Sequence, residues 1–126
     1  TKGETLQTIT FCWLQGEADG MKNNDLNAYY EKSLKAVIAQ LRADMGREDI
    51  NIVIARISPF SNGVPAWDQI RKMLVAVAES DSRGAWIDTD DIDRDEKDIH
   101  YSRKGYPQLA KRFAEKAIGL IKAKSK

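Results

Sequence analysis

Residues 6–19 read LQTITFCWLQGEAD, an apolar run followed directly by a polar turn. The apolar part, residues 6–13, predicts a buried strand. The turn supplies Gln15, whose amide both donates and accepts, and Gly16, which lets the backbone come close to a ligand. Open parallel sheets bind ligands outside the carboxyl ends of their strands. The stretch therefore predicts a strand that delivers side chains to a functional site.

The rest of the chain alternates between helix and strand patterns. Apolar runs predict strands at 6–13, 50–57 and 84–88. Apolar positions three or four residues apart predict helices at 26–45 and 65–80. A last helix is expected to follow residues 102–106 and to end at about residue 122. Asn24 or Asp25 is expected to cap the first helix and Ser102 the last one. A β-α-β-α-β-α order with short loops predicts an α/β fold with a parallel sheet.

Three strands are few for such a sheet, because five or six are typical. We therefore expect residues 1–126 to be the C-terminal part of a single larger domain, with only its last three βα units present. The chain reaches its first core strand within a few residues, which favours the same interpretation.

Composition excludes several classes of protein. The chain of 126 residues has 20 basic and 19 acidic residues, so no basic excess indicates a nucleic acid partner. No run approaches the roughly 18 consecutive apolar residues of a membrane span. The single cysteine, Cys12, lies in an apolar run and is expected to be buried.

The only histidine, His100, follows the third predicted strand and precedes the last helix. Asp98 is two residues away and Asp95 five. A carboxylate that orients and stabilises an imidazolium is what a histidine general base needs. The alternative is a solvent-exposed acidic loop in which the histidine has no catalytic role.

Other chemistries have weaker support. The acidic run at 88–96 does not fit a calcium loop, because Ile92 or Glu96 stands where the EF-hand template needs a ligand or a glycine. No cysteine–histidine cluster or phosphate loop is present, so no metal and no cofactor is expected. A nucleophile is also missing: the best-placed serine, Ser58, is followed by Pro-Phe and has no obvious oxyanion nest.

These motifs resemble those of a known family. The run WLQGEAD at 13–19 is similar to the Trp-x-Gln-Gly-Glu-Ser-Asp/Asn block of the SGNH-type carbohydrate esterases, the branch of sialate O-acetylesterases and acetylxylan esterases. The strand at 50–57 and the run WDQIR at 67–71 resemble the next two segments. The DIH run at 98–100 and the helix after it resemble the family's Asp/His block and last helix.

The resemblance implies a three-layer, flavodoxin-like fold and removal of acyl groups from a sugar. His100 would be the general base, Asp98 would orient it, and Gln15 would replace the asparagine that other members use as an oxyanion donor. Gly16 and Glu17 would contact the substrate, an acetylated carbohydrate. The family also favours a periplasmic or secreted location.

Three features depart from the family pattern. The block with the nucleophilic serine has no counterpart here, Ala18 replaces a serine, and one residue rather than two separates Asp98 from His100. We therefore expect the nucleophile on sequence outside this chain, with an N-terminal segment or a second chain completing the sheet. The alternative is a non-catalytic α/β domain that binds a carbohydrate or a protein. A receiver-type signalling domain would need an acidic pocket, and only Asp88 fits one.

Overall fold

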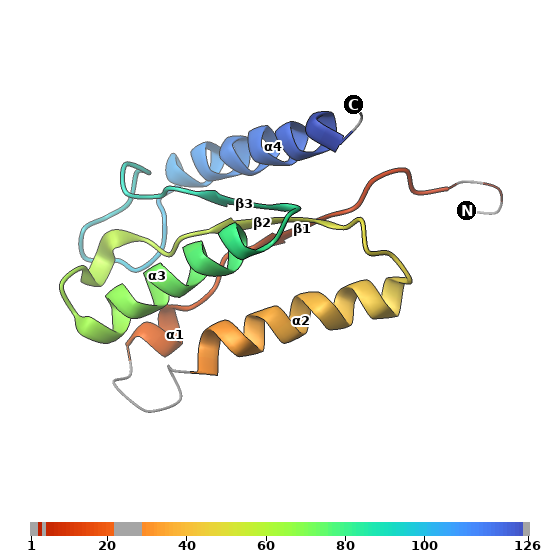
Figure 1. Ribbon diagram of the computed structural model, residues 1–126. Coiled ribbons are helices and arrows are strands. Elements are labelled where there is room, and N and C mark those ends of the chain that lie inside the picture. Colours follow the sequence, from red (N-terminus) through yellow and green to blue (C-terminus); the bar gives the residue numbers. More distant parts are fainter. Residues whose placement is uncertain (1–2, 4, 22–28, 125–126) are drawn as a thin grey trace.

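The computed structural model describes residues 3, 5–21 and 29–124 (Figure 1). In chain order the elements are β1 (Thr10–Trp13), α1 (Glu17–Gly20), α2 (Tyr30–Met45), β2 (Asn51–Ala55), the 3₁₀ turn η2 (Pro59–Ser61), α3 (Pro65–Ser80), β3 (Gly84–Ile87) and α4 (Gly105–Lys124).

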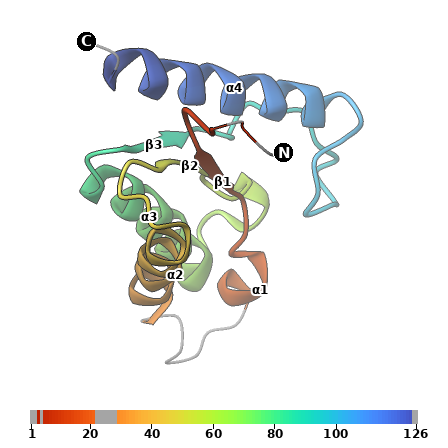
Figure 2. The ribbon, with the colours of Figure 1, turned by 90° about the vertical axis from the view of Figure 1, so that its right-hand side faces the viewer.

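The three strands form one parallel sheet in the order β1-β2-β3, with β2 at its centre. Helices α2 and α3 lie on one face of the sheet and α4 lies on the other (Figure 2). The structure thus confirms the predicted α/β class, a parallel sheet between two layers of helices.

Strand β2 carries the core because helices cover both of its faces, and all five of its residues are buried. Ile52 and Ile54 pack with Trp67 of α3 on one side. On the other side, Val53 and Ala55 belong to a second apolar cluster with α4. Two buried faces explain why this strand reads as an unbroken apolar run.

Some predicted boundaries were too wide. The first strand begins at Thr10 rather than residue 6, and Leu6 is exposed. The segment predicted as a loop after Gln15 contains the short helix α1. The predicted caps Asn24 and Asp25 lie outside the described residues.

Cys12 corrects the expectation of a buried thiol, because it is exposed. It points to the sheet face that α4 covers, but α4 packs against β2 and β3 rather than β1. The α4 side of β1 is therefore open.

Two helix ends follow the expected chemistry. Gly46 ends α2 in the left-handed conformation, at φ 60°. Ser102 begins the turn into α4, and its hydroxyl accepts the backbone N–H groups of Lys104 and Gly105. In the part of the chain that the structure describes, no helix is both long and apolar enough to cross a membrane.

Candidate active site

A cavity of about 390 Å³ lies where the chain leaves β1 and where the loop after β3 returns toward α4. Its lining includes Gln15 and Glu17 from the first segment and His100 from the second. Tyr101 and Tyr106 complete its α4 side. The two motifs, some eighty residues apart in the sequence, therefore share one cavity at the carboxyl edge of the sheet.

Gly16 makes the turn after β1 possible. Its φ of 147° is a backbone angle that residues with a Cβ rarely adopt. A Cβ at this position would lie 2.6 Å from Cγ2 of Ile70 and 3.3 Å from the hydroxyl of Tyr30. The glycine lets the chain turn directly above α3, and this turn places Gln15 at the cavity. Close packing against Ile70 and Tyr30 explains why a glycine stands here, and contact of Gly16 with substrate stays a prediction.

Gln15 is held by hydrogen bonds on both sides of its amide. Its Nε2 donates to Oδ2 of Asp19 over 3.1 Å. The hydroxyl of Tyr30 donates to the backbone carbonyl of Gln15 over 2.6 Å and lies 3.2 Å from its Oε1. Trp13 Nε1 in turn donates to this hydroxyl over 3.2 Å.

His100 and Asp98 form a pair within the loop between β3 and α4. Oδ1 of Asp98 lies 2.9 Å from Nδ1 of the imidazole and also accepts the backbone N–H of His100 over 2.9 Å. The backbone bond first, and then the imidazole, lower the pKa of the Asp98 carboxyl, which therefore stays ionised. An ionised acceptor at Nδ1 favours a proton on that nitrogen and leaves Nε2 as the basic atom.

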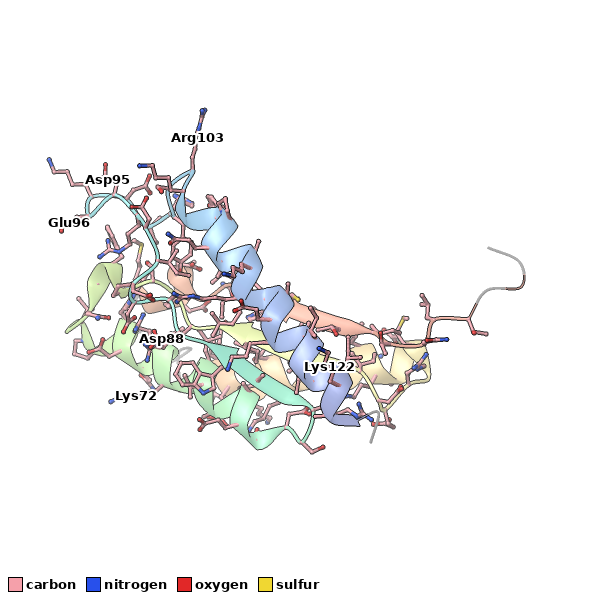
Figure 3. All side chains as sticks on the ribbon, turned by 90° about the horizontal axis from the view of Figure 1, so that it is seen from above. Lys72, Asp88, Asp95, Glu96, Arg103 and Lys122 are labelled. Atoms are coloured by element: carbon pink, nitrogen blue, oxygen red, sulfur yellow. The ribbon has the colours of Figure 1, made fainter. Side chains whose placement is uncertain are left out.

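This pair is open to solvent, since the side chain of His100 is 72% exposed and that of Asp98 is 56% exposed. Asp95 makes no such contact, because its carboxylate accepts the backbone N–H of Lys97. In Figure 3, Asp95 and Glu96 project outward at the tip of the loop. The geometry thus brings Asp98, and not Asp95, to the imidazole.

Three arginines, one just after β2, one in α3 and one in α4, hold the first part of this loop. Arg56 pairs with Asp88 and Asp90, and Arg71, a buried residue of α3, also pairs with Asp90. Arg112 of α4 pairs with Asp91. The carboxylates of Asp88, Asp90 and Asp91 in the acidic run are thus matched by arginine side chains. Among the described residues, no group of three or more acidic, histidine or cysteine side chains could hold a metal ion.

Ser58 was expected at the end of the second strand, but β2 ends at Ala55, and Ser58 follows three residues later and is completely buried. Its hydroxyl donates to the carbonyl of Ile99 over 3.4 Å, and its own carbonyl accepts the indole N–H of Trp67 over 2.9 Å. These contacts give it a structural role beneath the histidine loop. Among the described residues that line the cavity, there is no serine.

Sequence reasoning missed the aromatic residues of the site. Tyr30 reaches Gln15 from the first turn of α2, and Tyr101 lies buried against the sheet beside His100. From the sequence, Tyr30 is only an apolar position of the first helix, and Tyr101 is only the residue after His100 in a loop. The one available signal was the position of Tyr101 directly after the candidate base.

Fold and site together define a class: an α/β protein with an imidazole–carboxylate pair and an oriented amide at the carboxyl edge of a parallel sheet. Pairs and amides of this kind occur in hydrolases that use a histidine base and an oxyanion donor.

The family follows from a comparison with family models. The model described as "Carbohydrate esterase, sialic acid-specific acetylesterase" matches residues 2–119. The chain therefore belongs to this carbohydrate esterase family, as the sequence motifs predicted. Comparisons with curated proteins and with solved structures give no match.

Proposed function

We propose that this chain supplies the general base, its orienting carboxylate and one oxyanion donor of a carbohydrate acetylesterase. His100 is the base, Asp98 orients it, and Gln15 donates to the oxyanion. The observation that carries the proposal is the shared cavity of Gln15 and His100. The 2.9 Å contact of Asp98 with Nδ1 supports it, because it leaves Nε2 to handle the proton.

The chemistry follows from these positions. A serine outside this sequence attacks the acetyl carbonyl, and Nε2 of His100 takes the hydroxyl proton. The tetrahedral oxyanion accepts a hydrogen bond from the Gln15 amide. The C–O bond to the sugar then breaks, and His100 returns the proton to the departing sugar hydroxyl. Water then attacks the acetyl group on the serine while His100 takes a proton from the water. His100 returns this proton to the serine oxygen, and acetate is released.

Glu17 gives the cavity a group suited to a sugar. It lies beside Gln15 in the lining, and a carboxylate accepts hydrogen bonds from sugar hydroxyls. The family description makes an O-acetylated sialic acid the first substrate to test.

The open side of β1 supports a further segment in the complete enzyme. Among the described residues, only β2 pairs with β1, and Cys12 is exposed on the face that α4 leaves open. An unpaired strand edge is a template for another strand. We propose that an N-terminal segment or a second chain pairs there and brings the nucleophilic serine to the cavity.

We expect the isolated chain to hydrolyse an activated acetyl ester or an O-acetylated sialic acid no faster than background. Even a complete serine hydrolase keeps only about 10³–10⁴ of acceleration over water once its triad is removed, and this chain supplies only part of the proposed site. Acetate release by the chain alone, measured beside a complete family enzyme, tests this. Turnover at the rate of the complete enzyme that is abolished by Ser58→Ala would contradict the proposal.

The identity of the orienting carboxylate is tested by a matched pair of variants in the complete enzyme. Asp98→Asn is expected to lower kcat by about 10³–10⁴, because loss of the carboxylate disturbs the imidazole tautomer. Asp95→Asn, in the same loop, is expected to leave kcat within about twofold, because Asp95 contacts only Lys97 through its carboxylate. A large loss at Asp95 with none at Asp98 would transfer the role to Asp95.

A further inference from the structure

A chain of hydrogen bonds runs from the core to the amide at the cavity. The indole N–H of Trp13 donates to the hydroxyl of Tyr30 over 3.2 Å. That hydroxyl donates to the backbone carbonyl of Gln15 over 2.6 Å, with Oε1 as a second acceptor 3.2 Å away. Tyr30 thus contacts both the main chain and the side chain of the residue assigned to the oxyanion.

Tyr30 is well suited to hold a neighbour in place. It is the first residue of α2 and is only 8% exposed. Burial, the largest cause, raises the pKa of its hydroxyl to about 12. The hydroxyl therefore keeps its proton throughout the working range of an esterase, and it always remains a donor.

The two partners of the Gln15 side chain specify a single orientation of its amide. A carboxylate only accepts hydrogen bonds, so Oδ2 of Asp19 selects the Nε2 end. The single proton of the Tyr30 hydroxyl is shared between the backbone carbonyl and Oε1 of Gln15, which favours the Oε1 end on this side. Nε2 has two N–H groups and donates one to Asp19. The second N–H has no partner among the described residues and belongs to a side chain that lines the cavity.

We propose that Tyr30 is a positioning residue, which with Asp19 holds the Gln15 amide so that its second N–H donates to the oxyanion. The inference rests on the proposed role of Gln15. In addition, Tyr30 of α2 fixes the orientation of this donor, although no residue of α2 lines the cavity. Preorganised donors are effective because they need no rearrangement when charge develops.

A double-mutant cycle in the complete enzyme tests the proposal, with kcat and KM for acetate release as the measurement. Tyr30→Phe removes only the hydroxyl and is expected to lower kcat about tenfold, a fraction of the about 10²–10³ of a whole oxyanion donor. KM is expected to change little. With Gln15→Ala already present, Tyr30→Phe is expected to have no further effect on kcat. Tyr29→Phe, at the exposed neighbouring tyrosine, is the control and should behave as the wild type.

The outcomes separate the two proposals. Equal losses from Tyr30→Phe in both backgrounds, or no loss in either, would overturn the positioning role and leave Gln15 as the donor. An unchanged kcat in Gln15→Ala alone would overturn the oxyanion assignment, and the positioning role with it.

A second pair of variants does not depend on a buried residue. Asp19 is only partly buried, so its replacement should leave the fold intact. Asp19→Ala frees the other end of the amide and is expected to lower kcat severalfold. Asp19→Asn keeps an oxygen acceptor and is expected to recover part of that loss. Equal kcat values for the two variants would contradict the proposed hold on Nε2.

Discussion

Replacing His100 with alanine in the complete enzyme is expected to lower kcat by about 10⁴- to 10⁶-fold. The imidazole accepts the nucleophile's proton and then delivers it to the leaving sugar, so its removal disables both halves of the reaction. The fold should be unaffected, because the side chain is 72% exposed and contacts mainly Asp98. The measurement is kcat for acetate release, with the thermal unfolding midpoint recorded for each variant.

Arg103→Ala is a suitable control for this experiment. Arg103 lies three residues after His100, at the start of the turn into α4, and its side chain projects away from the ribbon in Figure 3. Its activity should match the wild type. A loss of less than tenfold in His100→Ala would show that another group carries the proton.

Gln15→Ala is expected to lower kcat by about 10²–10³ with a smaller change in KM. The reason is that a single oxyanion donor acts mainly on the charge that develops in the transition state. Gln15→Met keeps a side chain of similar length but has no N–H to donate. It should therefore lower kcat about as much as alanine does.

The methionine variant also separates donation from packing. If Gln15 only filled space in the turn, a methionine of similar length would keep the activity. Wild-type kcat in Gln15→Met would therefore contradict the oxyanion role, whereas loss in both variants at an unchanged unfolding midpoint supports it.

Elements with strong local signals could be predicted from the sequence. Helix α3 runs from Pro65 to Ser80 as expected, because a proline suits the first helical turn and the apolar positions repeat regularly. The meeting of Gln15 with His100 also follows from a simple rule, since both come after the carboxyl ends of parallel strands.

The features that the sequence did not predict share one physical cause. A local sequence pattern does not show which other elements pack against a residue in the fold. Cys12 lies in an apolar run, yet the helix that covers its sheet face packs over β2 and β3. Leu6 belongs to the same apolar run but precedes the residues that pair with β2. The bond between Tyr30 and Gln15 joins residues fifteen positions apart, which no helical or strand period relates.

The loop that carries the base is closed at its foot. Arg94 and Tyr101 form an antiparallel bridge, and the backbone N–H of Ser102 donates to the carbonyl of Asp93 over 3.1 Å. Residues 95–97 at its tip are exposed and lie outside these contacts. Exposed tips anchored in this way tolerate insertion and deletion. We therefore expect residues 95–97 to accept a change in loop length, because the bridge between Arg94 and Tyr101 closes the loop on both sides of them.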